Sequence, residues 1–426
     1  MFLIYINQSS PRLRYVLNFI FNEMYGFDFK TTKDKDYFKS FSGCKLNYSK
    51  EIIGDEFFIK SNDFVNDLSI KKISLNVSSK DGFEIFFQNN SDLNFDLFSA
   101  VFYLLSRYEE YLPAKKDKYG RFSAEESFAF KNNFLNKPLI NIWLHHFKLK
   151  LKSKYPDIKF KKHNFSYIST IDIDQAYAYK HQHLYRNIIS FLKILLNWDI
   201  KKIKLMFNVI FKKEKDPFDT FDKQLKINNF FNVKPLYFIL LSDYGLYDKN
   251  NHYKNEKFQK LIQNLNSKYT LGLHPSYQSN LNYRKINVEL NRLSSIINQS
   301  VNMSKQHYLK ISFPSTYREL IKLGIEKDFS LGYASLPGFR ASVCHPFKFY
   351  DLENEKQTDF VVYPFQVMDT TFRHYNQSNF THETKQYIDL VKKYNGIFIS
   401  IFHNDSFYLN EWSNNYEEML KCIFND

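Results

Sequence analysis

Apolar and polar residues alternate along the chain in a pattern that changes near residue 160. Before that point, the pattern predicts a strand at 2–6, a helix that begins after Ser10, and two further helices at about 96–112 and 138–152. After it, short β-branched and aromatic runs regularly precede helical patterns. The predicted strands are 167–173, 235–241, 269–274, 306–312, 360–369 and 397–402. The predicted helices are 220–230, 255–267, 283–298, 315–323, 383–394 and 412–424.

This order of elements predicts an α/β protein with two domains. Residues 1–160 form a mixed α/β accessory domain, and residues 165–426 form a domain in which parallel strands are covered by helices. In such folds, the residues that do chemistry gather at the carboxyl ends of the strands. The candidates at those ends are Asp172, Asp174, Asp243, His274, Asp369 and His403. His307 lies near the start of its predicted strand, which is the wrong end under this rule.

The first strand of the second domain ends in two carboxylates, Asp172 and Asp174. Side chains alternate along a strand, so these two point the same way. Two like charges on one face repel each other unless a cation or a shared proton lies between them. One interpretation is therefore a divalent metal site with a base beside it. The other is a pair of solvated carboxylates that caps the following helix.

The net charge of the 426-residue chain is +14, which raises the question of a nucleic-acid partner. The lysines are scattered along the sequence, so we expect a basic surface and no nucleic-acid partner. The cysteines, Cys44, Cys344 and Cys422, have neither metal-like spacing nor the pattern of a disulfide framework. The short apolar run at 2–6 lacks the features of a signal peptide. We therefore expect a reducing compartment and a cytoplasmic location.

The most apolar segment, residues 188–211, is interrupted by Lys193, Asp199 and three further lysines, so we expect no integral membrane segment. Its pattern predicts an amphipathic helix pair. We expect this pair to cover the core, with peripheral contact to a membrane surface as the alternative. The sequence does not predict the oligomeric state.

The motifs in residues 165–426 resemble those of the polysaccharide deacetylases, the NodB-like carbohydrate esterases of family four. Residues 170–174 (TIDID) are similar to their Thr-Phe-Asp-Asp-Gly motif, with one extra residue between the aspartates. Residues 397–403 (IFISIFH) are similar to their last motif, an apolar strand that ends in His. The resemblance implies a distorted (β/α) barrel in a divergent branch that carries an extra N-terminal domain.

The resemblance also implies a metal site. Asp172 would be the catalytic base, and Asp174 and His274 would be metal ligands. The family has a second His four residues after the first, whereas this chain has Gln278 there. His307 is our candidate for the missing ligand. The implied cofactor is a divalent metal ion, for which we expect zinc.

Three further roles follow from the same resemblance. Arg340 lies in a segment loosely similar to the one whose Arg orients the catalytic carboxylate, and Asp369 lies where the family's fourth motif is expected. His403 would donate a proton to the leaving group. Among the aromatic residues near strand ends, Tyr244, Tyr277 and Phe339 are candidates for stacking on sugar rings.

The implied function is a metal-dependent hydrolase that removes N- or O-acetyl groups from a carbohydrate. It would act on non-peptide carbon–nitrogen bonds or on ester bonds, and surface or capsular polysaccharide is the expected setting. A glycan-binding barrel with impaired catalysis is one alternative, which Gln278 favours. A metal-dependent glycosyltransferase is another, because an Asp-x-Asp pair can hold the metal of a nucleotide sugar. We find no glycine-rich phosphate turn before residue 172 to support it.

Overall fold

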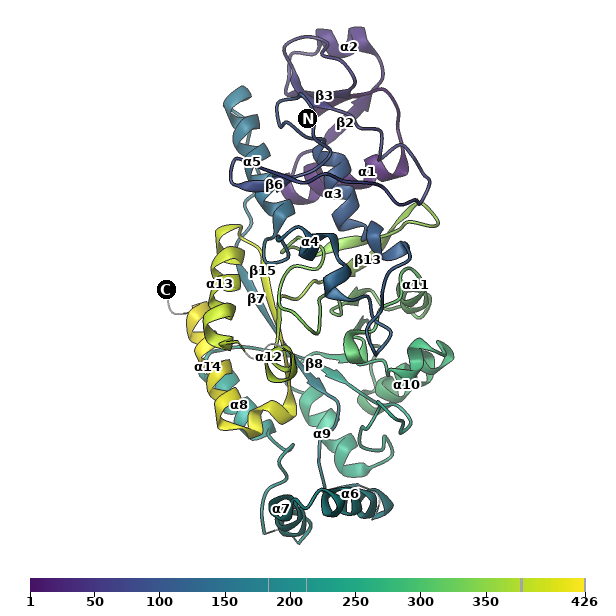
Figure 1. Cartoon of the computed structure of the whole chain (residues 1–426), viewed down its shortest axis with the longest axis vertical. Helices are drawn as coiled ribbons and strands as arrows, with labels where there is room; N and C mark the ends of the chain where they lie inside the picture. The colour runs from purple at the N-terminus through teal and green to yellow at the C-terminus, as the bar shows by residue number, and fades with distance from the viewer. Residues whose placement is uncertain (183, 212, 376–377, 425–426) are drawn as a thin grey trace.

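A computed structural model describes residues 1–182, 184–211, 213–375 and 378–424. The described chain forms an N-terminal parallel-sheet domain followed by a curled, nine-stranded half-barrel. Figure 1 shows the N-terminal domain stacked on one end of the half-barrel along the long axis of the molecule. The predicted fold class, an α/β protein with a distorted (β/α) barrel, is confirmed. The limits proposed for the two domains stay a prediction.

The N-terminal sheet has four parallel strands in the order β2-β1-β3-β4. These are β1 (Phe2–Ile6), β2 (Phe29–Thr32), β3 (Lys45–Ser49) and β4 (Phe57–Lys60). A separate antiparallel pair is made by β5 (Ser78–Lys80) and β6 (Phe83–Ile85). The predicted strand at 2–6 is confirmed, and its five residues are all buried.

The first helical segment of the N-terminal domain begins and ends at residues that favour caps. Ser10 accepts a hydrogen bond from the backbone N–H of Leu13, and the π-helix that continues this helix ends at Gly26, which has a positive φ of 73°. The helical segments are α1 (Pro11–Leu17), η1 (Asn18–Tyr25), α2 (Lys35–Ser40), α3 (Leu97–Leu105), η2 (Tyr108–Tyr111), η3 (Ala124–Glu126), α4 (Phe128–Lys131) and α5 (Leu139–Lys154).

The half-barrel sheet has the strand order β12-β13-β11-β10-β9-β8-β7-β15-β14. Every neighbouring pair is parallel except β12 and β13. The strands are β7 (Ser166–Ile173), β8 (Leu236–Ile239), β9 (Leu271–Leu273), β10 (Met303–Ser304), β11 (Lys327–Asp328), β12 (Phe347–Asp351), β13 (Lys356–Val362), β14 (Val367–Met368) and β15 (Ile397–His403).

Helices follow the strands, as the alternating pattern predicted. After residue 211, the α-helices among the described residues are α8 (Phe221–Phe230), α9 (Glu256–Asn266), α10 (Arg284–Ile297), α11 (Ser315–Lys322), α12 (Asp369–His374), α13 (Phe380–Lys393) and α14 (Asn410–Phe424). Short 3₁₀ turns lie at η4 (Gln278–Asn280), η5 (His307–Leu309) and η6 (Asn404–Tyr408). The helix predictions in this half are confirmed to within a few residues at each end.

Two strand predictions need correction. The predicted strand at 306–312 is wrong, because the strand in this region is only Met303–Ser304 and pairs with β9 and β11. His307 therefore follows the carboxyl end of its strand, where functional residues are expected in such folds, and not the start of a strand as predicted. The predicted strand at 360–369 is two strands, β13 and β14, on opposite sides of the sheet.

Alternation along β7 divides its side chains between two environments. Ile171 and Ile173 are fully buried in the main hydrophobic core, which also contains residues of the covering helices. The opposite face carries Ile168, which packs with a smaller apolar cluster that includes Ile399 and Phe365, and then the polar Thr170 and Asp172. The interior of the half-barrel thus changes from apolar to polar toward the carboxyl ends of its strands.

The prediction that residues 188–211 cover the core is wrong. The segment forms α6 (Leu184–Leu196) and α7 (Ile200–Ile210), which project at the end of the molecule far from the N-terminal domain (Figure 1). Within the described residues, no helix is both long and apolar enough to cross a bilayer. We call the exposed apolar residues of this pair the hairpin face: Ile188, Ile189, Leu192, Leu195, Leu196, Trp198, Ile200, Phe207, Ile210 and Phe211.

The two domains share one core and several polar contacts. Hydrophobic residues of both domains belong to a single buried cluster. Arg12 of α1 is fully buried and donates to both carboxylate oxygens of Glu355, each at 3.0 Å, in the turn between β12 and β13. Tyr15 donates to the carbonyl of Lys348 at 2.8 Å. These contacts fix the N-terminal domain against the antiparallel strands β12 and β13 at one edge of the half-barrel.

Candidate metal and hydrolase site

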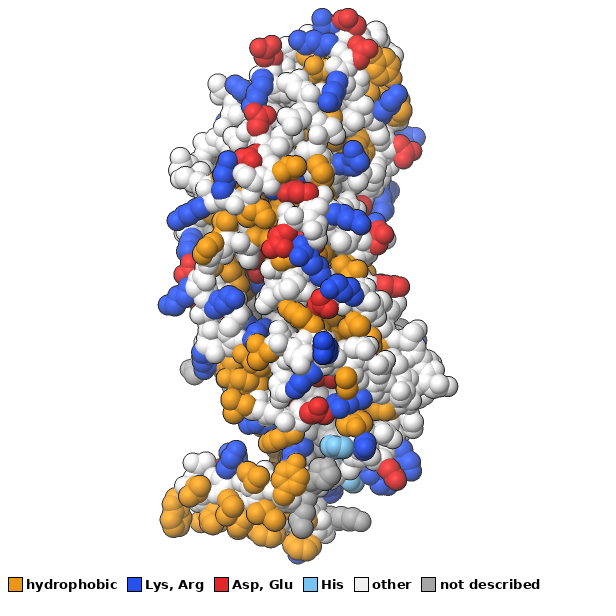
Figure 2. All heavy atoms as spheres, turned by 90° about the vertical axis from the view of Figure 1, so that its right-hand side faces the viewer, with side chains coloured by type: hydrophobic (Ala, Val, Ile, Leu, Met, Phe, Trp, Pro, Cys, Tyr) orange, Lys and Arg blue, Asp and Glu red, His pale blue; other side chains and the backbone are white. Residues whose placement is uncertain are grey.

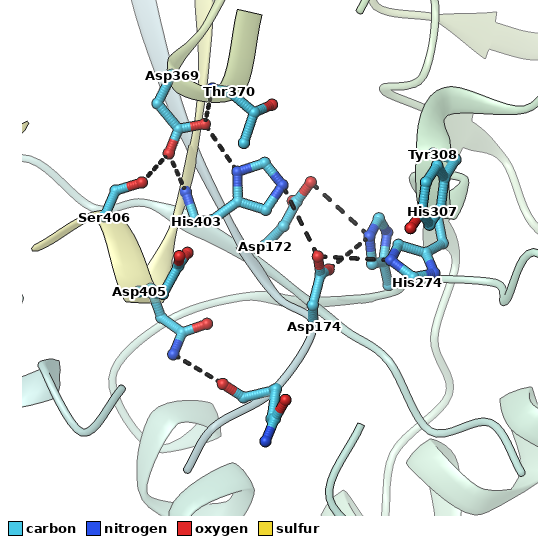
Figure 3. A network of polar contacts seen from close by, with 12 residues as sticks. Asp172, Asp174, His274, His307, Tyr308, Asp369, Thr370, His403, Asp405 and Ser406 are labelled. Atoms are coloured by element: carbon cyan, nitrogen blue, oxygen red, sulfur yellow. Dashed lines mark hydrogen bonds and ion pairs between the residues drawn. The ribbon is translucent and has the colours of Figure 1, made fainter. Parts of the chain in front are cut away.

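Six of the seven predicted site residues meet at the carboxyl ends of the half-barrel strands. Five of them line a cavity of about 440 Å³, and the sixth, Asp369, holds the lining residue His403. Figure 3 shows Asp174 near the centre of this group, with imidazoles on two sides of it. The six residues are Asp172, Asp174, His274, His307, Asp369 and His403.

His274 follows β9 and is buried against Asp174. Its Nδ1 makes a short hydrogen bond with the backbone carbonyl of Lys305, which can only accept, so Nδ1 carries the proton. Its other ring nitrogen, Nε2, lies 3.2 Å from Oδ1 of Asp174. Two electron-rich atoms at this distance need a cation or a proton between them.

His307 approaches Asp174 from the other side. Its Nε2 is 3.4 Å from Oδ2 of Asp174, and its Nδ1 is 2.8 Å from Oδ1 of the buried Asp248. Burial opposes the charge on this imidazole, but the neighbouring carboxylates, Asp174 first, raise the pKa of His307 to about 9. Desolvation likewise opposes ionisation of Asp174, yet His307 and the other imidazoles hold its pKa well below the usual value.

Asp174, His274 and His307 fit a metal ion. One ligand atom from each lies within 4.8 Å of the others, and Oδ1 of Asp174 is buried without a hydrogen bond among the described residues. Bond lengths of about 2.0–2.2 Å in a tetrahedral zinc site put ligand atoms about 3.4 Å apart. Here the two imidazole nitrogens lie 3.2 Å and 3.4 Å from the two different oxygens of Asp174. Hydrogen bonds to both Nδ1 atoms orient the two rings, as in many metal sites.

Asp172 is paired with a lysine that sequence reasoning missed. Lys305 is fully buried, and its Nζ lies 2.7 Å from Oδ1 of Asp172 and 2.6 Å from Oγ1 of Thr170. Burial lowers the pKa of Lys305, while Asp172 acts in the opposite direction. The only sequence signal was the position of Lys305 directly after a strand, which the misplaced strand at 306–312 concealed.

His403 ends β15 and is held by Asp369. Its Nδ1 is 2.7 Å from Oδ1 of Asp369, and its backbone N–H donates to Oδ2 of the same carboxylate at 2.8 Å. Its Nε2 faces the cavity, 4.0 Å from Oδ2 of Asp174. Burial disfavours the charged ring, but Asp369 and then Asp174 raise the pKa of His403 to about 10. The two carboxylates thus favour the imidazolium form of His403.

Arg340 does not hold Asp172 as predicted. Its guanidinium is buried against Glu110 of the N-terminal domain, with Nε 2.9 Å from Oε1, and it donates to the carbonyl of Gly332 at 2.9 Å. Burial opposes ionisation of Glu110, but Arg340 and Arg107 together lower its pKa. The side chain thus stabilises the contact between domains, and Lys305 occupies the position beside Asp172.

Two further residues near strand ends lie outside the ligand group. Oε1 of Gln278 accepts a hydrogen bond from Lys285 at 2.5 Å, and Gln278 is absent from the cavity lining. Asp243 is largely exposed and pairs with Arg292 at 2.7 Å. Asp248, five residues later, supports His307 instead. Nothing in the sequence distinguished these two aspartates, because the loop that follows β8 has no regular pattern.

The N-terminal domain forms one wall of the cavity. Lys118, Tyr119 and Arg121 line it together with residues of the half-barrel. Arg121 donates to the carbonyl of Tyr308 at 2.9 Å, and the Tyr119 and Tyr308 rings are 4.9 Å apart. The aromatic residues that line the cavity are Tyr119, Phe218, Tyr308 and Tyr375. The predicted stacking residues Tyr244, Tyr277 and Phe339 are not among them.

A family of unknown function (DUF7033) matches residues 2–156. No curated protein sequence matches the chain.

The chain is structurally similar to polysaccharide deacetylases over about 60% of its length. A protein assigned as a polysaccharide deacetylase from Mycobacterium smegmatis has 11% identity and a TM-score of 0.41, covering 62% of this chain and 86% of its own. A second from Pseudomonas aeruginosa PAO1 has 11% identity and a TM-score of 0.39, covering 61% and 84%. PuuE allantoinase has 9% identity and a TM-score of 0.39, with the same coverage. Similarity at this level carries no conclusion about what the chain binds or catalyses.

The ligand group predicts which substitutions weaken metal binding. We expect His307→Ala to abolish stoichiometric binding of a divalent ion, and Asp248→Asn to weaken it by about 10–100-fold, because Asp248 orients the His307 ring. Gln278→Ala is the matched control and should bind as the wild type does. Isothermal titration with zinc measures all three. Equal binding by the wild type and His307→Ala would contradict the assignment of this ligand.

The buried pair predicts a double-variant result. We expect Lys305→Met to lower the free energy of unfolding by about 3–5 kcal/mol, because the Asp172 carboxylate then lacks its buried counter-ion. Adding Asp172→Asn removes the unpaired charge and should restore part of that loss. Chemical denaturation of the two single variants and the double variant tests this coupling. Purely additive losses would show that the pair is not energetically coupled.

Proposed function

We propose that this protein is a metal-dependent hydrolase that removes acetyl groups from a carbohydrate. The observation that carries the proposal is the arrangement around Asp174, where three potential metal ligands lie beside a buried carboxylate, Asp172, and an imidazole, His403. Hydrolysis of an amide or ester needs a nucleophilic water, a polarised carbonyl and a proton for the leaving group. The cavity brings residues suited to each need together.

The proposed metal ligands are Asp174, His274 and His307. A divalent ion there, for which we favour zinc, would supply Lewis-acid chemistry to the acyl oxygen and to water. Asp172 accepts the proton of the attacking water, and Lys305 keeps this carboxylate oriented toward the cavity. The unused oxygen of Asp172, Oδ2, lies 3.9 Å from Nε2 of His274, on the side of the ligand group.

His403 acts as the general acid. The carboxylate of Asp369 fixes the ring, so that Nδ1–H points to Asp369 and Nε2–H points into the cavity. Its Nε2 proton goes to the departing amine or alcohol oxygen, because the Asp369 carboxylate raises the pKa of His403 and so favours the protonated ring. Asp369 is a positioning residue in this scheme because its contacts are with His403, Ser406 and Thr370 (Figure 3).

The walls of the cavity suit a sugar ring. Aromatic faces pack well against the C–H faces of sugars, and the cavity has aromatic side chains from both domains. Tyr119 comes from the loop 117–122, whose Asp117 accepts hydrogen bonds from the backbone of Tyr119 and Arg121 at 2.9 and 3.0 Å. This loop is therefore ordered by its own contacts, and the N-terminal domain would take part in substrate binding.

A glycan-binding barrel without catalysis is the second candidate. Gln278 favoured it because the family's second His is missing. His307 lies beside Asp174 and can supply the missing imidazole, so the lack of a histidine at position 278 is weaker support for the non-catalytic candidate. An assay of acetate release separates the two candidates, since binding of an acetylated glycan without release of acetate would support the second.

The activity test is release of acetate from N-acetylated glucosamine oligomers and O-acetylated sugar oligomers by the zinc-loaded protein. We expect Asp172→Asn and His403→Gln each to lower kcat by about 10²–10⁴-fold, because each removes one proton-transfer group. Both variants should still bind zinc, since neither residue belongs to the ligand group. A zinc-loaded wild type that binds the oligomers but releases no acetate would reject the hydrolase.

The contact between Asp369 and His403 predicts a change in pH dependence. An acid catalyst is lost as pH rises through its pKa, and the Asp369 carboxylate is the main cause of the raised pKa of His403. Asp369→Asn should therefore move the alkaline limb of the kcat profile to lower pH by about one unit or more. Asp389→Asn, the same change at a distant site on α13, is the control. An unshifted alkaline limb in Asp369→Asn would argue against His403 as the acid.

A further inference from the structure

The hairpin face is an apolar surface that no described part of the chain covers. Leu196, Trp198 and Ile200, at the turn between α6 and α7, are 79%, 83% and 72% exposed. Figure 2 shows the apolar side chains of this pair gathered at the lower end of the molecule. Amphipathic helices in water usually turn their apolar side toward the protein core. Here a large part of it faces outward, which indicates a partner.

The inward side of the pair is already packed. Met206 and Val209 of α7 are buried. The two helices also contact each other through the Phe191 and Phe207 rings, whose centres are 5.8 Å apart, although Phe207 is partly exposed on the hairpin face. Arg186 of α6 is buried and donates to the carbonyls of Lys249 and Asn250 at 2.9 and 2.7 Å. The pair is thus fixed to the half-barrel through its inner side, and the hairpin face cannot turn inward without breaking these contacts.

The charges on the hairpin identify the kind of partner. The exposed lysines of the two helices are Lys193, Lys201, Lys202 and Lys204, and the one acidic residue between Leu184 and Phe211 is Asp199, which pairs with Lys202 at 2.9 Å. Apolar residues, a tryptophan and flanking lysines together are the composition that binds the interface of a bilayer with anionic lipids. We propose that the α6–α7 hairpin docks this protein on an anionic lipid surface.

A second copy of the chain fits the hairpin less well. Homodimers usually form around a two-fold axis, which would place the same lysines of both copies near one another. Like charges brought together in an interface are unfavourable. A negatively charged lipid surface reverses the sign of this interaction, so the same lysines become favourable.

The hairpin is inserted next to the cavity. Gln175 and Phe218, which precede and follow it in the chain, both line the cavity. Asp216 ties the two stems together by accepting the backbone N–H groups of Tyr179 and Lys180, both at 2.9 Å. Docking through the hairpin would therefore hold the catalytic half of the molecule at the lipid surface. This inference does not depend on the proposed reaction.

The test is co-sedimentation of the full chain with vesicles. One set contains phosphatidylcholine alone, and the other contains phosphatidylcholine with phosphatidylglycerol. We expect binding to the second set to be at least tenfold stronger and to weaken as salt rises, because the lysines are screened. Equal or absent binding to both sets would overturn the proposal.

Two variants separate the apolar and the charged contributions. The triple variant Leu196→Ser, Trp198→Ser, Ile200→Ser should bind anionic vesicles at least tenfold more weakly than the wild type. The double variant Lys201→Glu, Lys204→Glu should lose the preference for phosphatidylglycerol. Because these side chains are exposed, both variants should keep the thermal midpoint of the wild type.

Phe230→Ser is the matched control, since Phe230 on α8 is 81% exposed but lies outside the hairpin. It should bind vesicles as the wild type does, and loss of binding in this variant would overturn the assignment to the hairpin. Sedimentation analysis of the lipid-free protein tests the dimer. A dimer that the triple variant dissociates, with no vesicle binding by the wild type, would show that a second copy covers the hairpin face.

Discussion

The buried ion pair between Asp172 and Lys305 is the interaction on which the site depends. It joins β7 to the segment after β10, across the two intervening strands β8 and β9. Both side chains are buried, so each charge requires the other. The backbone carbonyl of Lys305 also accepts a hydrogen bond from Nδ1–H of His274. The same residue therefore orients the Asp172 carboxylate and one potential metal ligand. A shift of this segment would therefore disturb the base and the ligand group together.

The ligand group shows how one position can be replaced by another. A histidine at 278 would have shared a loop with His274, but Gln278 points toward Lys285. His307 reaches Asp174 from the next strand in the sheet and is oriented by Asp248. Asp248 also accepts the backbone N–H groups of Tyr277 and Gln278, so this carboxylate links the loop with the missing histidine to the residue that replaces it.

Sequence reasoning located the ends of β7 and β15 because long β-branched runs end sharply in Asp or His. It therefore found Asp172, Asp174 and His403 at the site. It misplaced β10, since two residues carry no periodicity, and with it missed Lys305. Arg340 was assigned to the wrong partner because a buried arginine looks the same in sequence whether it meets Asp172 or Glu110. Amphipathicity in α6 and α7 was visible, but the pattern does not say which surface covers the apolar side.

The two ends of the hairpin and the end of β7 lie close together in the fold. Only nine residues separate Asp174 from the first residue of α6, and Asp216 closes the loop on the other side. The strand that delivers both aspartates to the cavity thus also starts the segment that carries the hairpin face. At the opposite wall, Arg121 and Tyr119 of the N-terminal domain contact Tyr308, the residue after His307. The ligand group therefore lies between a wall formed by the N-terminal domain and the strand that leads to the hairpin face. A displacement of either neighbour would change the surroundings of Asp174.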